Sequence, residues 1–330
     1  MKLLVTGGCG FIFSNFIRYM LKKYPDYEII NLDALFYAGR LENTEDFKDN
    51  PNYRFVKGNI CDEKLVDELM QEVDWVVNGA AQTHVDRSIT DPDEFIKTDI
   101  LGTYTLLEAA KKHNIKKFLA ISTDEVYGSI DKGLFTEKSL IKPNSPYSAS
   151  KAGADLMVRA YFKTYNLPVL ITRSSNNYGS FQYPEKMIPL FVTNLLEEKK
   201  VPLYGDGLNV RDWLYVLDNC SGIDLVLHKG KFGEVYNIGA DNEKTNKEIT
   251  EIILKQLGKD DSWIKHVKDR PGHDKRYALD SSKIKKLGWK PEYDFEKAIK
   301  ETIDWYKNNE DWWKKIKSGE FLEYYKKQYK

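Results

Sequence analysis

The chain has 330 residues, which at roughly 150 residues per domain corresponds to about two domains. Apolar residues make up 42% of it and charged residues 30%, so the composition is that of a folded protein and excludes a mainly disordered one. Fifty basic residues balance 50 acidic ones, and the resulting net charge of zero gives no general attraction for nucleic acid or an anionic membrane.

Short β-branched or apolar runs recur through the first half of the chain, with segments of helical spacing between them. This alternation predicts an α/β fold of Rossmann type, a doubly wound parallel sheet covered by helices on both faces. Ligands are then expected at the carboxyl ends of the strands. The predicted strands span residues 2–6, 27–32, 53–57, 75–78, 117–122 and 168–173.

After about residue 175 the pattern loosens, which predicts a smaller mixed α/β lobe, and a further strand is predicted at 234–238. We expect the larger domain to comprise residues 1–175 plus about 211–240. The smaller lobe would comprise about 176–210 and 241–330. The last stretch, 312–330, mixes aromatic residues with lysines and predicts one amphipathic closing helix that packs on the body.

The sequence gives no sign of a membrane span, a secretory signal or a disulfide framework. Its longest apolar runs are far shorter than the roughly 20 residues that cross a bilayer. Three cysteines, Cys9, Cys61 and Cys220, are widely spaced and lie outside any Cys/His cluster. We therefore expect a reduced, cytoplasmic chain without a metal site, a membrane partner or a nucleic-acid partner.

The first predicted strand ends in the glycine-rich segment TGGCGFIF and leads into a helix. Gly7 and Gly10 would let the backbone approach a pyrophosphate at the helix N-terminus. Asp33 ends the second strand, where a carboxylate accepts hydrogen bonds from an adenosine ribose, which favours NAD over NADP. A tight turn with an incidental aspartate is the alternative. Phe13 stands where the motif would place a third glycine, which implies a displaced helix or a reshaped cleft.

Two further segments carry groups suited to proton transfer. Tyr147 and Lys151 are spaced to share one helix face, where an ammonium can stabilise a tyrosinate that takes the proton of a sugar hydroxyl. Such pairs are common on ordinary helices, so this one gains weight from the glycine motif in the same chain. Thr123, Asp124 and Glu125 follow a buried strand and offer two carboxyls for acid and base roles, although a solvated turn would look the same.

Isolated basic residues are harder to interpret. His84 has no second ligand at metal spacing, which favours a structural role. Arg211, Arg270, Arg276 and Lys186 lie in the smaller lobe, where arginine forks would suit a diphosphate. Ordinary surface salt bridges are the alternative for them.

Taken together, these segments resemble the extended short-chain dehydrogenase/reductase family and, within it, the nucleotide-sugar 4,6-dehydratases. The similarity extends over nearly the whole length and in the same order. It is carried by TGGCGFI, DALFYAGRLEN, THVDRSI, STDEVYG, SPYSASK, SNNYG, FQYPEKMIPL, RDWLYV, YNIGADNEKTN and DRPGHDKRYALD. The resemblance implies an NAD-binding larger domain and a nucleotide-sugar-binding lobe. It also implies a homodimer formed through a four-helix bundle of helices around 94–112 and 147–165.

The activity implied by the resemblance is a lyase reaction, the NAD-dependent dehydration of dTDP-glucose to dTDP-4-keto-6-deoxyglucose. C4 is oxidised, water is eliminated across C5 and C6, and the hydride returns to C6. Tyr147 would take the C4 hydroxyl proton, with Lys151 holding the tyrosine and the nicotinamide ribose. Glu125 would remove the C5 proton, Asp124 would protonate the departing hydroxyl, and Thr123 would hydrogen-bond the C4 oxygen.

The resemblance also implies which residues contact the ligands. Cofactor contacts are implied at Gly7, Gly10, Phe11, Ile12, Asp33, Asn59, Ile60, Ala80, Ala81, Thr98, Tyr147, Lys151 and Asn177. Nucleotide-sugar contacts are implied at Thr83, Asn176, Lys186, Met187, Tyr204, Arg211, Asn246, Arg270 and His273.

The sequence departs from the family pattern at a few positions besides Phe13. Asn59 replaces an aspartate, Gln82 and Thr83 replace a Glu-Ser pair, and Asp99 replaces an asparagine.

The sequence is also compatible with two other functions. A nucleotide-sugar 4-epimerase or another dehydratase, acting on a UDP-sugar, would share the cofactor site, but a 4-epimerase does not need the carboxyl pair of Asp124 and Glu125. A non-catalytic NAD-binding protein has no need of an intact set of proton-transfer groups.

Overall fold

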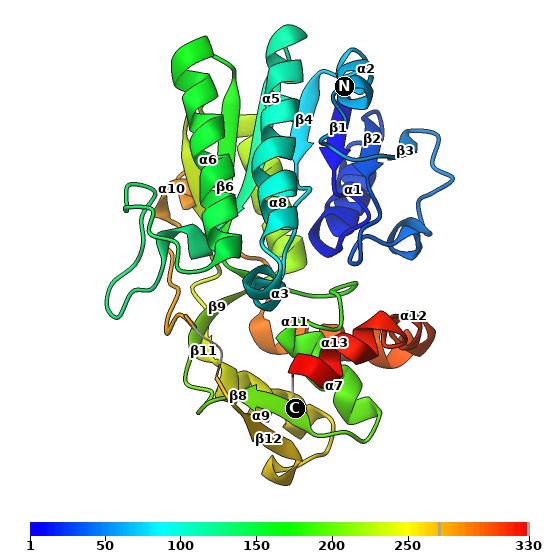
Figure 1. The fold of residues 1–330 in the computed structure, drawn as a ribbon, viewed down its shortest axis with the longest axis vertical. Coiled ribbons are helices and arrows are strands. Elements are labelled where there is room, and N and C mark those ends of the chain that lie inside the picture. The colour runs from blue at the N-terminus through cyan, green and yellow to red at the C-terminus, as the bar shows by residue number, and fades with distance from the viewer. Residues whose placement is uncertain (270–271, 329–330) are drawn as a thin grey trace.

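The computed structural model describes residues 1–269 and 272–328, and its larger part is built on a seven-stranded parallel sheet (Figure 1). The strand order is β10-β6-β5-β4-β1-β2-β3, which confirms the predicted fold class. These strands are β1 (Lys2–Thr6), β2 (Glu28–Asp33), β3 (Tyr53–Lys57), β4 (Trp75–Asn78), β5 (Lys117–Thr123), β6 (Val169–Ser174) and β10 (Val235–Ile238).

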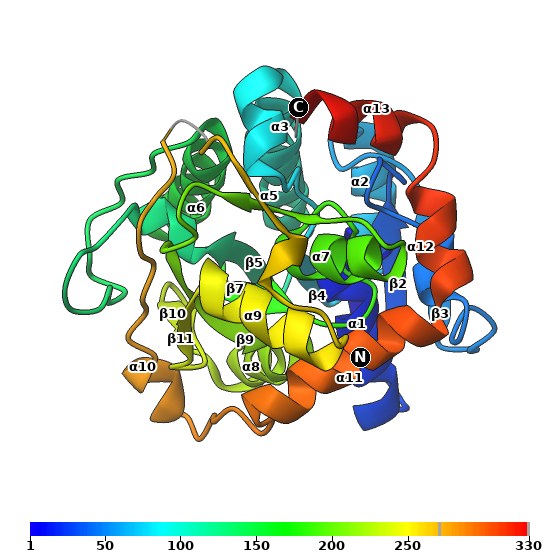
Figure 2. The ribbon, with the colours of Figure 1, turned by 90° about the horizontal axis from the view of Figure 1, so that it is seen from below.

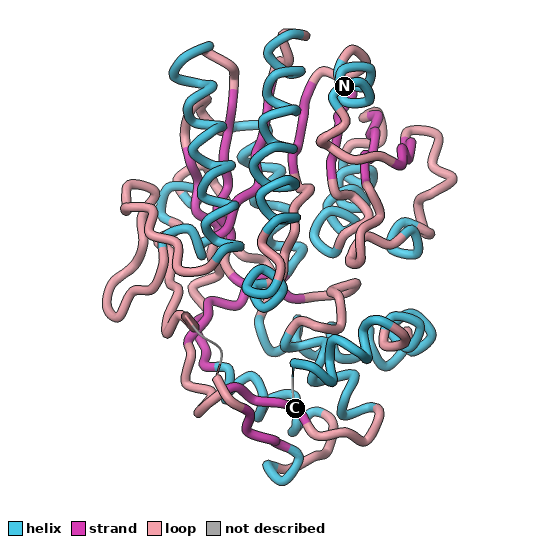
Figure 3. Tube along the Cα trace, viewed as in Figure 1, coloured by secondary structure: helices cyan, strands magenta, loops and turns pink. Residues whose placement is uncertain are grey.

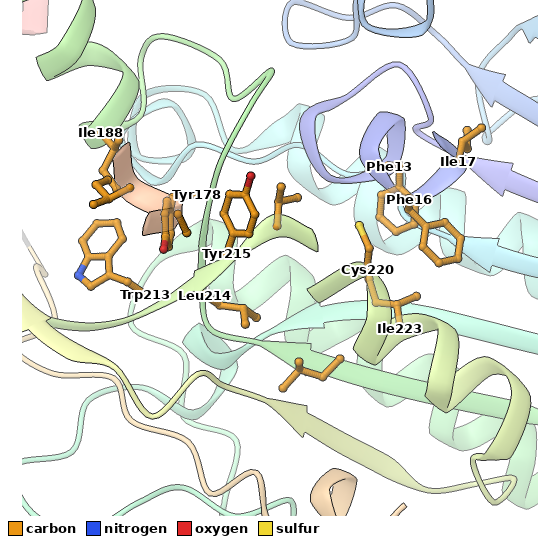
Figure 4. Close-up of a cluster of buried hydrophobic side chains, with 14 of the residues drawn as sticks. Phe13, Phe16, Ile17, Tyr178, Ile188, Trp213, Leu214, Tyr215, Cys220 and Ile223 are labelled. Atoms are coloured by element: carbon orange, nitrogen blue, oxygen red, sulfur yellow. The ribbon is translucent and has the colours of Figure 1, made fainter. Parts of the chain in front are cut away.

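Helices cover both faces of this sheet because its strands are apolar on both sides. Leu3 and Val5 of β1 belong to the same buried cluster as helices α1 (Phe11–Lys23) and α8 (Val216–Lys229). Leu4 points to the opposite face. That face is covered by α2 (Glu63–Met70), α5 (Gly102–Lys112) and α6 (Pro146–Tyr165), of which α5 and α6 lie side by side in Figure 1. Figure 4 shows Phe13 and Phe16 of α1 near Cys220 and Ile223 of α8.

The smaller lobe lies beyond the carboxyl ends of the strands (Figure 1), so that it lies in front of the large sheet when the molecule is seen from below (Figure 2), and it holds two small sheets. One contains β7 (Asn176–Tyr178), β9 (Val210–Tyr215) and β11 (Glu243–Thr245), and the other pairs β8 (Val201–Tyr204) with β12 (Ile264–Val267). Helices α7 (Met187–Leu196), α9 (Asn246–Gln256) and α11 (Phe295–Asn308) pack around them. The predicted strand 234–238 returns to the large sheet as β10, whereas 210–215 stays in a small sheet as β9. The domain boundaries themselves stay a prediction.

One helical prediction needs correction. The single closing helix over 312–330 is wrong, because α12 (Glu310–Ile316) and α13 (Glu320–Gln328) are separated at Gly319, whose φ of +53° suits glycine. Trp313 and Phe321 on these two helices are buried, so the stretch packs on the body as expected. The expected helix around 94–112 consists of α4 (Asp93–Phe95), a π-helical turn η2 (Ile96–Leu101) and α5.

Short elements complete the chain, and Figure 3 shows the loops that connect the helices and strands. They are η1 (Leu41–Thr44), α3 (Val85–Thr90), η3 (Asp124–Tyr127), η4 (Asp261–Trp263) and α10 (Ser282–Lys285). Among the described residues, no helix has the length and apolar character needed to cross a membrane.

Candidate functional site

The carboxyl ends of the central strands open into a cleft of about 300 Å³. Every residue for which the sequence predicts a cofactor contact lines this cleft, and so does every predicted catalytic residue. A second cavity of about 160 Å³ adjoins it on the side of the smaller lobe, and Glu125, Asn176 and Lys186 line both. Segments from both halves of the chain therefore meet at one site.

The glycine turn brings the backbone of β1 close to that of β4. Gly7 has a φ of +73°, and a Cβ at this position would lie 2.8 Å from the Cα of Ala80, so only glycine fits here. The turn is closed by a hydrogen bond from the Gly10 N–H to the Gly7 carbonyl oxygen at 3.1 Å. Helix α1 begins at Phe11 beside the cleft, so its first N–H groups provide a site suited to an anionic group.

Asp33 is held by the loops on both sides of it. Its carboxylate accepts hydrogen bonds from the backbone N–H of Cys9 at 2.9 Å and of Leu35 at 2.8 Å. Burial raises the pKa of Asp33, and these two hydrogen bonds oppose the rise. Each carboxylate oxygen has a second lone pair, so Asp33 can also accept hydrogen bonds from ribose hydroxyls in the cleft.

Tyr147 and Lys151 occupy the first turns of α6, which starts with a capping box between Ser145 and Ser148. The Lys151 ammonium donates to the carbonyl oxygen of Ile121 at 2.7 Å, which fixes it below the end of β5. Desolvation raises the pKa of the Tyr147 phenol well above its usual value, and nearby carboxylates, Glu125 foremost, raise it further. A positive charge near the phenol would favour the tyrosinate.

Thr123, Asp124 and Glu125 lie where β5 passes into η3. The Thr123 hydroxyl donates to Asp124 Oδ1 at 3.1 Å and accepts from the Glu125 N–H at 3.3 Å. Asp124 is 2% exposed, and burial together with the adjacent Glu125 raises its pKa well above the usual range. Asp124 is thus suited to carry a proton, whereas Glu125 is partly exposed between the two cavities. The two carboxyls have different environments, as acid and base roles require.

The second cavity gathers most of the predicted substrate contacts. Arg211 is 4% exposed, and its guanidinium donates to the carbonyl oxygens of Val210 at 2.7 Å and of Asp274 at 2.9 Å. Lys186 donates to the Thr83 carbonyl oxygen at 2.6 Å. The residues lining this cavity include Asn176, Lys186, Met187, Tyr204, Arg211, Asn246 and His273, while Thr83 lines the first cleft. Arg270 lies outside the described residues.

Two other basic residues, Arg276 and His84, make contacts of a structural kind. Arg276 forms a two-pronged ion pair with Glu243 at 2.6 and 2.7 Å, as expected of an ordinary salt bridge. The His84 ring is buried edge-on against Tyr324, with ring centroids 5.9 Å apart, although it also lines the second cavity.

Asp99, which replaces the family's asparagine, is a buried carboxyl beside the proton-transfer groups. It lies in the π-helical turn η2 and is 1% exposed. Its Oδ1 accepts from the Gln82 N–H at 3.0 Å, and its Oδ2 accepts from the Ser150 hydroxyl at 2.5 Å. Burial raises its pKa to about 6, against the opposing charge of Lys151. Asp99 therefore links α6 to the loop that lines the cleft.

Several lining residues have no individual signal in the sequence, although four of them lie in the segments DALFYAGRLEN and FQYPEKMIPL. Tyr37, Gln182, Tyr183 and Glu185 come from irregular loops far from the glycine motif. Asn219 is different, because an amide among the apolar residues of helix α8 is visible in the sequence. In the structure this amide is fully buried. Its Oδ1 accepts from the Ser174 hydroxyl at 2.7 Å.

The cleft is chemically suited to a polar ligand. Several buried side-chain atoms on its lining have no hydrogen-bond partner among the described residues. They include Asp124 Oδ2, Asn176 Oδ1, Asn177 Oδ1, Gln182 Oε1 and Asn219 Nδ2. Buried polar atoms are rarely left without partners, so their concentration around one cavity fits a ligand rich in hydroxyl and phosphate groups. The glycine turn and Asp33 fit a dinucleotide in the same space.

Comparisons with known proteins agree with this geometry. The family model described as GDP-mannose 4,6 dehydratase matches residues 4–302. The chain is 51% identical over 311 residues to the low-salt glycan biosynthesis protein Agl12 of Haloferax volcanii, covering 94% of this chain and 100% of that protein. It is also 51% identical over 323 residues to a dTDP-glucose 4,6-dehydratase of Streptomyces antibioticus, covering 96% of each.

Solved structures show the same relationship. DesIV, a dTDP-glucose 4,6-dehydratase from Streptomyces venezuelae with NAD and TYD bound, matches with a TM-score of 0.94 and 50% identity, over 96% of this chain and 100% of that chain. A UDP-glucose 4-epimerase from Thermotoga maritima with UDP-glucose matches with a TM-score of 0.86 but 30% identity, over 93% of this chain and 99% of that chain. The chain therefore belongs to the extended short-chain dehydrogenase/reductase family, among its dTDP-glucose 4,6-dehydratases.

Proposed function

We propose that this chain is an NAD-dependent hydro-lyase that converts dTDP-glucose to dTDP-4-keto-6-deoxyglucose. The observation that carries the proposal is the meeting of two proton-transfer pairs at one cleft. Tyr147 and Lys151 face the cleft from α6, and Asp124 and Glu125 face it from the end of β5. Related structures that hold NAD, and in one case TYD, support the choice of ligands.

The glycine turn and Asp33 supply the cofactor site. The N–H groups at the start of α1 would hold the pyrophosphate, and the Asp33 carboxylate would accept hydrogen bonds from the adenosine ribose. Phe11, Ile12, Ala80 and other predicted contacts line the walls of the same cleft. NAD, when bound, would take two electrons from the sugar at C4 and return them at C6, so that the reaction is redox-neutral overall.

Tyr147 starts the reaction on the sugar. Its phenolate oxygen would take the proton of the C4 hydroxyl, with the Lys151 ammonium stabilising the phenolate. Thr123 would hydrogen-bond the C4 oxygen from the end of β5. The ketone formed at C4 acidifies the C–H bond at C5, which makes the next proton transfer feasible.

Glu125 and Asp124 then carry out the elimination. Glu125 would take the C5 proton, because it lies between the two cavities. Asp124, whose pKa burial raises, would hold a proton ready for the departing C6 hydroxyl. Water leaves, and one carboxyl has gained the proton that the other has lost. A 4-epimerase would need no such pair.

The nucleotide end would be held in the second cavity. Arg211 and Lys186 bring two positive charges to it, and the diphosphate of a nucleotide-sugar brings negative ones. Met187, Tyr204, Asn246 and His273 complete the walls.

The experiment that tests the function is incubation of the pure protein, supplied with NAD, with dTDP-glucose and separately with UDP-glucose. We expect the alkali-induced absorbance of a 4-keto-6-deoxy sugar with dTDP-glucose. Release of a C4 epimer instead would make the chain an epimerase, and preference for UDP-glucose would overturn the assigned nucleotide. Absence of any product would overturn the proposal.

We also propose that the protein is a homodimer through a four-helix bundle of α5 and α6 with their copies. Five large apolar side chains stand out on this side of the molecule, each 40–53% exposed. They are Ile96 and Leu101 of η2, Tyr104 of α5, and Leu156 and Tyr165 of α6. Large exposed apolar side chains gathered on adjacent helices are typical of an interface.

A further inference from the structure

Phe13 stands in the first turn of α1, at the place where the glycine motif would have its third glycine. Its side chain is only 4% exposed, and the exposed part lines the cofactor cleft. Within α1 its ring packs edge-on against Phe16, with centroids 5.7 Å apart and planes at 65° (Figure 4). The ring is therefore part of both the core and the cleft wall.

Gly79 provides the space for this ring. It follows β4 directly, and a Cβ built on it would stand 2.1, 2.3 and 2.4 Å from the Cε2, Cδ2 and Cζ atoms of Phe13. Such distances are not tolerated between carbon atoms, and an aromatic ring cannot bend away as a flexible chain does. A side chain at residue 79 and the ring of Phe13 would occupy the same volume.

The need for glycine at residue 79 is steric and not conformational. Gly79 is absent from the glycines with positive φ, so its backbone suits any residue. Its N–H donates to the Thr6 hydroxyl at 3.2 Å, as does the Ala80 N–H at 3.1 Å. These bonds fasten the end of β4 to the end of β1, and the Phe13 ring lies over the junction.

We propose that Phe13 and Gly79 act as one interlocked pair that sets the spacing between the N-terminus of α1 and the end of β4, and thereby positions the dinucleotide. This inference rests on the proposed NAD-dependent function. The pair has a positioning role and takes no part in proton transfer. On this proposal Phe13 supports cofactor binding in this chain, although the glycine motif has a third glycine at this position.

The test is a double-mutant cycle of Phe13→Ala and Gly79→Ala, read as the dissociation constant for NAD by equilibrium dialysis. Gly79→Ala in the wild-type background forces a methyl group into the ring, and we expect NAD binding about tenfold weaker or worse. In the Phe13→Ala background the methyl group has space, and the same change should alter NAD binding by less than about twofold. Phe13→Ala alone should weaken NAD binding several-fold while sparing the proton-transfer groups, so that KM for NAD rises and kcat changes little.

Phe16→Ala is the matched control, because Phe16 is an equally buried ring on α1 that neither lines the cleft nor meets Gly79. It should lower the midpoint of urea unfolding and leave the NAD dissociation constant within about twofold. Gly79→Ala should remain harmful in the Phe16→Ala background.

The outcomes separate the inference from the function on which it rests. Additive effects of Phe13→Ala and Gly79→Ala would overturn the interlocked pair, as would equal NAD affinity of Phe13→Ala and the wild type. If Gly79→Ala alone does not fold, the pair requires that the double variant folds, and its failure would count against the proposal. A wild-type protein that binds no NAD would instead overturn the proposed function.

Discussion

The substitution Asp99→Asn tests whether a buried charge at the proton-transfer site is held at a cost to stability. Asparagine preserves the shape, and its amide oxygen can accept from the Gln82 N–H as Oδ1 does now, at 3.0 Å. The Ser150 hydroxyl lies 2.8 Å from the Tyr147 carbonyl oxygen and can donate there while accepting from the new amide. The variant therefore keeps the hydrogen bonds and removes the ionisation.

The magnitude follows from the shift of the Asp99 pKa. Burial raises this pKa from 3.8 to about 6 in the folded protein. A group whose pKa is higher in the folded state binds its proton more tightly there, so its stabilising contribution is fully present below pH 3.8. It is lost as the pH rises through about 6. At 1.36 kcal/mol per pKa unit the loss is about 3 kcal/mol. Asp99→Asn should thus raise the free energy of unfolding at pH 8 by about 1–3 kcal/mol relative to its effect at pH 4.

Urea denaturation of both proteins between pH 4 and 8 measures this difference. The gap between variant and wild type should grow between pH 4 and about 6 and stay constant above that value. Asp49→Asn, on the exposed surface, removes the same charge and should give no such gap. A gap that is independent of pH, or larger at low pH, would refute the reasoning. Because the Asp99 charge raises the pKa of Tyr147, the acid limb of the kcat/KM profile should also move to lower pH in the variant.

Other substitutions separate the chemistry from the scaffold and from assembly. Glu125→Gln should leave C4 oxidation intact and block elimination, so that absorbance of reduced cofactor builds up without product; normal turnover would exclude Glu125 as the base. Asp294→Ala removes the carboxylate that accepts from the Lys297 N–H at the start of α11, and should lower the free energy of unfolding by about 1 kcal/mol in urea without changing KM. Leu156→Asp should yield monomers in light scattering, whereas Leu140→Asp, an exposed loop substitution, should not; dimers in both would place the interface elsewhere.

The central sheet was predictable because its strands are apolar on both faces and short. The strands at 53–57 and 75–78 have the predicted bounds. Strand β5 ends one residue later than predicted, and β6 begins and ends one residue later than predicted. The closing helix was not predictable in the same way. Its aromatic and lysine pattern continues through Gly319, and the break depends on a backbone conformation that periodicity does not reveal.

The site was predictable where its residues belong to compact motifs. Thr123, Asp124 and Glu125 share one turn, and Tyr147 and Lys151 share one helix face, so their spacing carries information. Residues that reach the cleft through long connections have no such local signal.

The relation between Phe13 and Gly79 illustrates the limit. The unusual phenylalanine was visible in the sequence, but the glycine that accommodates it lies in another segment, and only the packing of α1 against β4 links them.

The zero net charge of the chain conceals a separation of charges at the site that bears on ligand orientation. Asp33 and Asp124 line only the first cleft and Arg211 lines only the second cavity, while Glu125 and Lys186 stand where the two cavities meet. A diphosphate is repelled by the carboxyls at the end of β5 and attracted by the two cations, so a nucleotide-sugar has one favourable direction of entry. In that direction the sugar, its uncharged end, is left beside the acid and base. Under the proposed function, the same local charges that would bind the ligand would also place C5 and C6 beside the groups assigned to the elimination.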